Sequence, residues 1–297
     1  MKLNHAYLFL LLMWGFLGSC ISEDYSDCYN RYVVDLSYMG DGNKEIFADK
    51  IRKVDMYIFD QENTCVHQSH LTEAEVGNRR TVLPPLDAGQ YRIVFLGNTY
   101  STGVRNLNTR ASEPVGMCFG AEAYWEGKEV SGNDSLYWAS IDQLIEPFDQ
   151  KMQPVFNTAC FKASHYDVSV EVLGTPSDLK IVLAGVSPYT DFNNIAAVGQ
   201  KTDYVLKTVY DGTSTVKAEC NILRHLDHEN VLLKVLSSDG VELASVNFDE
   251  FLRENSSYID CSEQEVLIPF KIEFKSSKVE ITLPDWLVTH VKPEFGI

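Results

Sequence analysis

Histidines at metal-ligand spacing are the first residues in this sequence that could do chemistry. Two His-x-x-His pairs occur, His67 with His70 and His225 with His228. Residues three apart point to opposite faces of a strand, so such a pair holds one metal ion only from a turn or a helix. Residues 224–230 add acidic neighbours between two expected strands, and a metal site or a glycan site is the alternative there to a solvated hairpin loop. We predict the loop, and neither a metal nor a cofactor.

Motifs of catalysis are absent from the sequence. It contains no glycine-rich nucleotide loop, no Gly-x-Ser-x-Gly, no His-Glu-x-x-His and no EF-hand spacing. The two acids of a glycosidase meet only in the folded protein and leave no fixed spacing, so a lipid-anchored glycosidase remains an alternative. We predict a protein that is not an enzyme.

Cys20 is the residue for which the sequence predicts a covalent modification. Lys2 supplies a positive start, residues 6–16 form an apolar run, and residues 17–20 read Leu-Gly-Ser-Cys, which resembles a lipoprotein lipobox. The run is too short to span a bilayer, which takes about 20 residues. We predict a signal peptide over residues 1–19 and an acylated Cys20 as the mature N-terminus. An ordinary signal peptide and an N-terminal membrane anchor are the alternatives.

An acidic tether follows the lipidation site over residues 20–30. Its Glu23, Asp24 and Asp27 resemble the signal that sends some lipoproteins to the outer face of the outer membrane. We expect lipid attachment to the outer membrane with the protein exposed at the cell surface. Periplasmic retention, with the tether as a solvated spacer, is the alternative.

The other six cysteines leave the disulfide state open. None lies in Cys-x-x-Cys spacing, so neither a zinc site nor a redox dithiol is indicated. Cys220 falls in the apolar phase of its strand and is expected to be a buried free thiol. The full set is Cys28, Cys65, Cys118, Cys160, Cys220 and Cys261.

Three further residues are candidates for surface chemistry. Trp125 and Trp138 lie in a stretch without periodicity, where they either stack on a sugar or pack against the core. We favour packing and keep ligand contact as the alternative. Ser135 lies in Asp134-Ser135-Leu136, which resembles a short O-glycosylation motif of exported proteins.

Strands must position all of these residues, because alternation with period two dominates the chain. Tyr166, Val168, Val170 and Val172 alternate with polar residues, and residues 268–274 do the same around Pro269, which confines its strand to an edge or a bulge near its start. Helices are few, and the best is predicted over residues 248–253. The fold class is therefore all-β, built from β-sandwiches.

Two domains fit the length of 297 residues. Periodicity is lost over residues 99–152, where we expect a loop excursion with one or two hidden strands, such as residues 135–140. The boundary is placed near residue 150, which gives an N-terminal domain over residues 31–150 and a C-terminal domain over residues 151–297. A net charge of −17 argues against nucleic acid as a partner, because that partner requires a basic surface.

A series of short motifs in a fixed order covers most of the mature chain. They resemble FimB-type fimbrial anchor lipoproteins, the fimbrillin-associated subunits of type V pili. After the lipobox and the acidic tether, the motifs are Phe47-Ala48, Val54-Asp55-Met56-Tyr57-Ile58-Phe59-Asp60, Leu86-x-x-Gly89-x-Tyr91 with Gly97-Asn98, Leu223 with His225-Leu226, Phe248-Asp249-Glu250-Phe251-Leu252, and Val279-Glu280-Ile281-Thr282-Leu283-Pro284-Asp285-Trp286.

The resemblance implies two tandem transthyretin-like β-sandwich domains and a structural role without catalysis. The implied subunit sits in the outer membrane through its lipid, docks the base of a fimbrium and limits its length. A pilus tip or stalk subunit and a surface glycan-binding adhesin are the alternatives.

Contact with fimbrial subunits is expected by β-strand addition, with residues 268–274 and 279–283 as candidates. Polymerising relatives are trimmed by an Arg-specific protease. Arg79-Arg80 is either such a cleavage site or the polar start of a strand, and we favour the strand.

Overall fold

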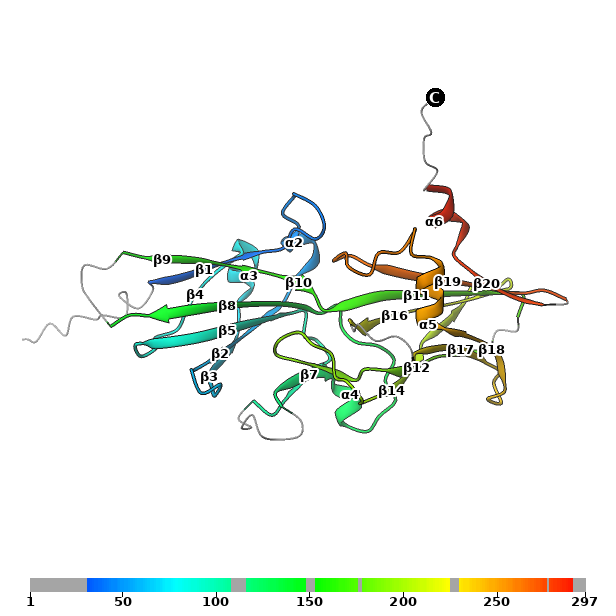
Figure 1. The fold of residues 1–297 in the computed structure, drawn as a ribbon, viewed down its shortest axis with the longest axis horizontal. Helices are drawn as coiled ribbons and strands as arrows, with labels where there is room; N and C mark the ends of the chain where they lie inside the picture. Colours follow the sequence, from blue (N-terminus) through cyan, green and yellow to red (C-terminus); the bar gives the residue numbers. More distant parts are fainter. Residues whose placement is uncertain are drawn as a thin grey trace, which may run out of the picture.

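Two β-sandwiches lie one behind the other along the long axis of the molecule (Figure 1). The computed structural model describes residues 31–290 apart from 108–115, 148–152, 176–177, 225–229 and 277. Strands make up most of the regular structure and the helices are short, so the predicted all-β class is confirmed. No helix in these ranges is long and apolar enough to cross a membrane. The predicted signal peptide, the tether and Cys20 lie outside the described residues.

The first sandwich, called the N-terminal sandwich below, has one sheet in the order β4-β1-β9 and another in the order β10-β8-β5-β2-β3. Val34, Leu36 and Tyr38 enter its core from alternate positions. Its strands are β1 Tyr32–Ser37, β2 Val54–Phe59, β3 Cys65–His70, β4 Arg80–Val82, β5 Gly89–Gly97, β8 Tyr137–Ile145, β9 Val155–Cys160 and β10 Lys162–Ala163, with the helices α2 Phe47–Lys50 and α3 Glu73–Asn78.

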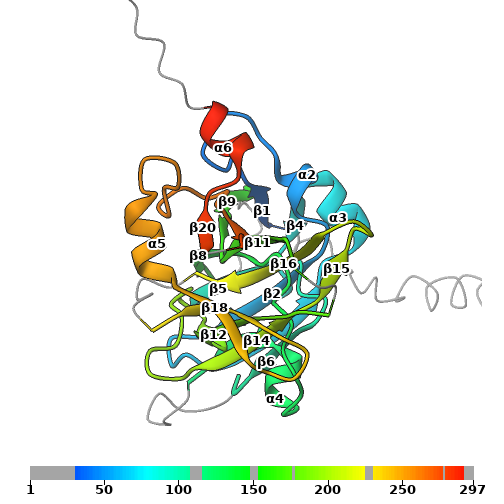
Figure 2. The same cartoon turned by 90° about the vertical axis from the view of Figure 1, so that its right-hand side faces the viewer.

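The second sandwich, called the C-terminal sandwich, has one sheet in the order β15-β16-β11-β19-β20 and another in the order β14-β12-β17-β18. Figure 2 looks along the long axis and shows these sheets as two layers, with α5 at one side. The elements are β11 His165–Leu173, β12 Lys180–Val186, β14 Thr202–Leu206, β15 Thr208–Tyr210, β16 Thr215–Leu223, β17 Leu232–Leu236, β18 Glu242–Asn247, α5 Phe248–Glu254, β19 Leu267–Phe274, β20 Val279–Thr282 and α6 Asp285–His290.

The predicted helix over residues 248–253 is confirmed as α5. The Asn247 side chain accepts a hydrogen bond from the Glu250 amide at 3.0 Å and so caps the first turn. Phe248, Phe251 and Leu252 turn into the core, as their spacing of three and four residues predicts.

The strand around Pro269 needs a correction. β19 lies between β11 and β20, and residues 271–273 of the expected edge strand over residues 268–274 are paired on both sides. Pairing with β20 begins only at Lys271, which leaves Pro269 at the start of β19 with a strand on one side alone. The edge strands of this sheet, among the described residues, are β15 and β20.

An arm leaves the N-terminal sandwich between β5 and β8 and reaches the other sandwich. It corresponds to the described part of residues 98–136 and contains β6 Thr102–Arg105, β7 Cys118–Ala121 and α4 Glu122–Trp125. These strands join β13, Tyr189–Asp191, in a small sheet ordered β13-β7-β6. The Val130 side chain lies in the core of the C-terminal sandwich, and its carbonyl accepts from the Val205 amide at 2.8 Å.

The expected domain boundary near residue 150 falls too early for the strand pairing. β9 runs parallel to β1, and β10 pairs with β8, so both complete the N-terminal sandwich. The pairing changes to the C-terminal sandwich at His165, the first residue of β11. Alternation shows which face of a strand is buried but not which strand it pairs with, and this explains the misplacement.

Candidate functional site

Phe192 forms the centre of an apolar contact between the two sandwiches, called the apolar lock here. It follows β13 and inserts its ring among Tyr57, Phe59 and Phe119, with centroid distances of 5.2, 5.3 and 5.7 Å. All three contacts are edge-to-face, the geometry that aromatic quadrupoles favour. The Phe192 side chain is buried. The lock therefore joins β2, the arm and β13 in one cluster.

Trp138 belongs to the same lock. Its indole Nε1 donates to the Phe192 carbonyl at 3.1 Å, and the Arg92 guanidinium donates to the same oxygen. The ring is half-buried against the cluster. Trp138 thus has its polar atom turned toward the other sandwich rather than toward solvent.

Trp125 packs on the neighbouring part of β13. Its ring stacks on Tyr189 at 5.1 Å, and the Arg105 guanidinium lies 5.6 Å from it. The indole nitrogen is buried without a hydrogen-bond partner among the described residues. The two predicted tryptophans therefore contact the same short segment, residues 189–192, which agrees with packing. Ligand stacking by these rings stays a prediction.

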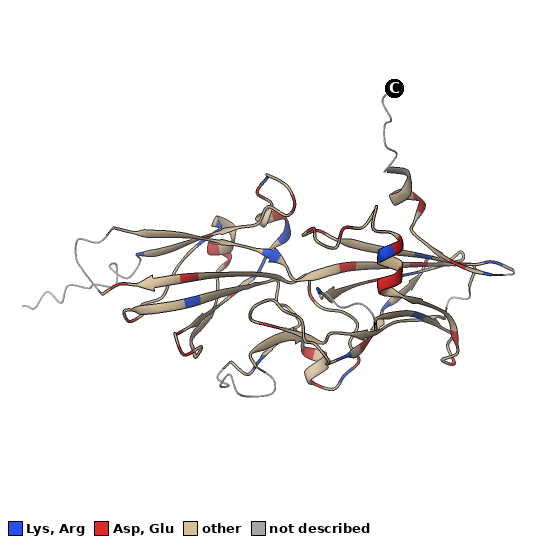
Figure 3. Cartoon of the chain, in the orientation of Figure 1, with Lys and Arg blue, Asp and Glu red and all other residues tan. Residues whose placement is uncertain are grey.

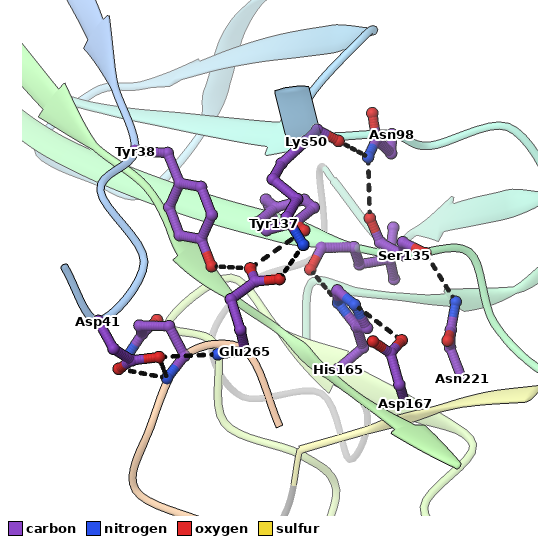
Figure 4. A network of polar contacts seen from close by, with 12 residues as sticks. Tyr38, Asp41, Lys50, Asn98, Ser135, Tyr137, His165, Asp167, Asn221 and Glu265 are labelled. Atoms are coloured by element: carbon purple, nitrogen blue, oxygen red, sulfur yellow. Dashed lines mark hydrogen bonds and ion pairs between the residues drawn. The ribbon is translucent and has the colours of Figure 1, made fainter. Parts of the chain in front are cut away.

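Glu265 forms the centre of a second, polar contact between the sandwiches, called the polar lock here. Its carboxylate accepts from the Tyr38 hydroxyl and from the Lys50 ammonium, and the Tyr137 hydroxyl lies at 3.5 Å (Figure 4). Asp41 completes the lock by accepting from the Glu265 amide at 3.0 Å. The polar lock thus ties the segment before β19 to the loop that follows β1, to α2 and to β8.

Two tyrosines of the polar lock have perturbed ionisation. Burial, and then the Glu265 carboxylate, raise the pKa of Tyr38 far above its ordinary value. Burial likewise raises the pKa of Tyr137. Both hydroxyls are therefore held as neutral donors.

Ser135 lies at the junction beside the polar lock. The Asn221 amide is 2.8 Å from its hydroxyl, and the amide orientation that satisfies both groups has Ser135 donating to the oxygen while the nitrogen donates to Asp167 at 2.7 Å. The Ser135 carbonyl accepts from Asn98 at 3.1 Å. The hydroxyl is half-buried and engaged between sandwiches, and its O-glycosylation stays a prediction.

The first His-x-x-His pair, His67 with His70, is not part of a metal-ligand cluster in the described part of the chain. His67 and His70 lie on β3, and the His70 ring nitrogen is 2.5 Å from the buried Asp55 carboxylate. No group of three or more potential metal ligands occurs within the part of the chain that the structure describes. His225 and His228 lie outside that part.

The described cysteines are free thiols with contrasting exposure. Burial raises the pKa of Cys118 to about 11 and that of Cys220 to about 12, while Cys160 is exposed. Cys65 and Cys261 are half-buried, and Cys28 lies outside the described residues. Cys220 is confirmed as a free thiol, but it is half-buried rather than buried as expected.

The predicted strand start at Arg79-Arg80 is confirmed. Arg79 ends α3 in the left-handed conformation, with φ of 53°. Arg80 begins β4, where its guanidinium donates to the Asp35 carboxylate of β1 at 2.6 Å. Cleavage at this pair stays the alternative interpretation.

Sequence reasoning missed the centres of both locks. Phe192 stands alone among polar turn residues, and its large apolar side chain outside any alternation is the signal that could have found it. Glu265 carries no comparable signal, because its neighbours are typical of a solvated loop.

Two sandwiches, joined by an arm and two locks, define a tandem β-sandwich protein. The family model of fimbrillin-A associated anchor proteins Mfa1 and Mfa2 matches residues 25–292. The chain therefore belongs to the family of fimbrillin-A associated anchor proteins.

Solved structures share this fold at low sequence identity. The fimbrial anchor protein Mfa2 from Porphyromonas gingivalis has a TM-score of 0.64 at 16% identity, covering 84% of this chain and 96% of that one. A candidate adhesin from Bacteroides ovatus has a TM-score of 0.66 at 12% identity, covering 86% and 93%. A candidate polysaccharide-binding protein from Bacteroides thetaiotaomicron has a TM-score of 0.63 at 14% identity, covering 85% and 95%. A search of curated proteins finds no match.

Proposed function

We propose that this chain is a lipid-anchored structural subunit that holds the base of a fimbrium at the outer membrane and limits its length. The observation that carries the proposal is the anchor-family match over residues 25–292. The lipobox ending at Cys20 supplies the membrane attachment. The role is mechanical and needs no catalytic group.

The placement of the first described strand supports this arrangement. β1 begins at the end of the N-terminal sandwich that is remote from the C-terminal sandwich (Figure 1). Residues 20–30 number 30 − 19 = 11 and span at most about 40 Å when extended. The lipid would hold this end near the membrane while the C-terminal sandwich projects.

Charge gives the lipid little help in this attachment. Lys and Arg are scattered among more numerous acidic residues along both sandwiches (Figure 3), and the chain has a net charge of −17. Anionic lipids attract basic residues, and a chain with this excess of acidic residues offers them little net attraction. Attachment is therefore assigned to acylation, for which a second acyl chain makes binding stable.

The lipid attachment is tested by replacing its acceptor. Cys20→Ala should move the protein from the membrane to the soluble fraction and shed fimbriae into the medium, because the acyl groups on Cys20 are the proposed membrane attachment. Cys28→Ala, eight residues later, is the matched control and should leave both readouts unchanged. Membrane fractionation of Cys20→Ala at the wild-type level would overturn the lipid anchor.

For the fimbrial contact we propose strand addition at the free edge of β20. The Lys275 amide donates to the Lys278 carbonyl at 2.9 Å in the β19–β20 hairpin. Antiparallel pairs alternate, so the backbone groups of Val279 and Ile281 face away from β19 and are open to an added strand. The Val279 side chain is also exposed.

A proline at the edge tests this contact. Val279→Pro removes an outward amide and should reduce capture of purified fimbriae by the protein, whereas Val279→Thr keeps the amide and should not. Equal capture by both variants, with both still at the membrane, would reject the β20 contact without touching the lipid anchor.

A further inference from the structure

A groove of about 430 Å³ opens beside the junction, formed by β10, the start of strand β11, the loop after β13 and the segment before β19. Its lining is mostly apolar, with Ala163, Tyr166, Ala196 and Ala197 among the walls. Its size is in the range of ligand-binding clefts. No residue of the apolar lock or of the polar lock lines this groove.

The charges around this groove have one sign. Lys162, Lys201 and Arg224 line it, and no Asp or Glu of the described ranges does. The chain as a whole has 42 acidic and 25 basic residues, so an all-cationic rim runs against the general composition. Lys162 and Lys201 are exposed and form no ion pair within the described structure. Their charges are therefore open to a ligand from outside.

Arg224 is held in place for such a ligand. Its Nε donates to the His165 carbonyl at 3.1 Å, its Nη2 donates to the Gln264 carbonyl at 3.0 Å, and the guanidinium stacks 4.7 Å from the Tyr166 ring. These contacts use one face and two nitrogens of the fork. The Nη1 group has no hydrogen-bond partner among the described residues. A fixed cation costs less side-chain entropy on binding than a free one.

Apolar side chains also lie exposed at the rim of the groove. Ile195 is 61% exposed and Val198 is 88% exposed, and both line the opening. A small ligand within the cavity would leave these side chains in water. A polypeptide segment lying across the opening would cover them, so the rim favours a protein partner.

A second hollow shows that the positive charge of the groove is local. The trough over the outer face of β11 and β16 is larger, about 1070 Å³, but Glu122, Glu126, Asp167 and Glu219 are among its several acidic residues. A segment attracted to the groove would be repelled there. Acidic residues outnumber Lys207 and Lys217 in the trough, so an acidic partner is favoured in the groove over the trough.

We propose that the groove binds an acidic segment of a second protein, with a large apolar side chain of that segment in the cavity and its carboxylates at Lys162, Lys201 and Arg224. The three cationic side chains that line the groove offer a partner to several carboxylates of such a segment. This inference does not depend on the anchor function.

Fluorescence anisotropy on the full chain tests the proposal with two labelled peptides, Asp-Phe-Asp-Ile-Asp and Lys-Phe-Lys-Ile-Lys. We expect the acidic peptide to bind and its affinity to fall as salt rises. The double variant Lys162→Glu with Lys201→Glu should weaken binding by about tenfold or more. Lys44→Glu with Lys207→Glu changes the net charge equally, away from the groove, and should leave the affinity within about twofold.

A cavity-filling variant separates the apolar part of the site from its charges. Ala197→Trp should weaken the acidic peptide about tenfold while the charges stay in place. Equal binding of the two peptides, or equal losses in the two charge-reversed variants, would overturn the proposal. So would binding of decanoate in the groove with no binding of the acidic peptide, which would assign the groove to a small anionic amphiphile.

Discussion

The apolar lock around Phe192 and the polar lock around Glu265 join the same two sandwiches by different physics. The first buries four aromatic side chains against one another, so its free energy comes from apolar area and dispersion. The second exchanges hydrogen bonds with water for hydrogen bonds within the protein, which leaves a small net gain. The apolar lock therefore supplies most of the free energy of the junction.

The polar lock contributes something that the apolar lock does not. Tyr38 is fully buried, and its hydroxyl has the Glu265 carboxylate as its acceptor. A slight rotation of one sandwich would leave that hydroxyl unpaired, at a cost of about 1–3 kcal/mol. Dispersion, the larger part of the aromatic contacts, changes little with a small shift, so the apolar lock tolerates such a rotation better than a single hydrogen bond does. The polar lock thus fixes the orientation of two bodies that the apolar lock holds together.

The largest effect is expected from Phe192→Ala. Removing a buried ring at the centre of the cluster should lower the free energy of unfolding by about 3–5 kcal/mol, measured by urea denaturation. Phe156→Ala is the matched control, because its ring is 62% exposed on β9 and should cost less than about 1 kcal/mol. Similar losses in the two variants would show that the apolar lock does not dominate the junction.

The elements on either side of the junction were predictable from sequence, because burial and alternation are local properties. Tyr166, Val168, Val170 and Val172 predicted the inward face of β11, and Asn247 predicted the start of α5. The strand over residues 135–140 was also expected, and β8 includes most of it. In each case one short segment carries the whole signal.

The candidate site could not be predicted in the same way, because it depends on contacts between distant segments. Glu265 meets Tyr38 across 227 positions, and Phe192 meets Tyr57 across 192 − 57 = 135. Neither pair leaves a spacing to read. Trp138 was predictable in part. Its aromatic side chain suggested a role, but only the fold shows that its indole faces Phe192.

A smaller effect is expected from Glu265→Ala. The variant removes the acceptor of the buried Tyr38 hydroxyl and should cost about 1–3 kcal/mol of unfolding free energy. Glu263→Ala, two residues earlier on the exposed side of the same segment, should change it by less than about 0.5 kcal/mol. If the loss in Glu265→Ala matched that in Phe192→Ala, the two locks would not differ as argued.

The smallest effect, and the sharpest distinction between the locks, is expected at alkaline pH. Burial and the Glu265 carboxylate raise the pKa of Tyr38, so this hydroxyl ionises in the unfolded chain near pH 10 but stays protonated in the fold. The stabilisation it gives is fully present below that pH and is lost as the pH rises further. The difference in unfolding free energy between wild type and Tyr38→Phe should therefore shrink by about 1 kcal/mol between pH 9 and pH 11.

The pH dependence of Phe192→Ala, in the apolar lock, is the control for that of Tyr38→Phe. Phe192→Ala contains no ionisable group at the altered position, so its difference from wild type should stay constant over the same pH range. Tyr100→Phe, at a 64% exposed ring, controls for general alkaline effects. If the Phe192→Ala difference shrank in parallel with that of Tyr38→Phe, alkali would be loosening the whole junction. A change confined to Tyr38→Phe would mean that ionisation of this one hydroxyl in the unfolded chain, and not a loosening of the junction, removes the stabilisation that the polar lock gives.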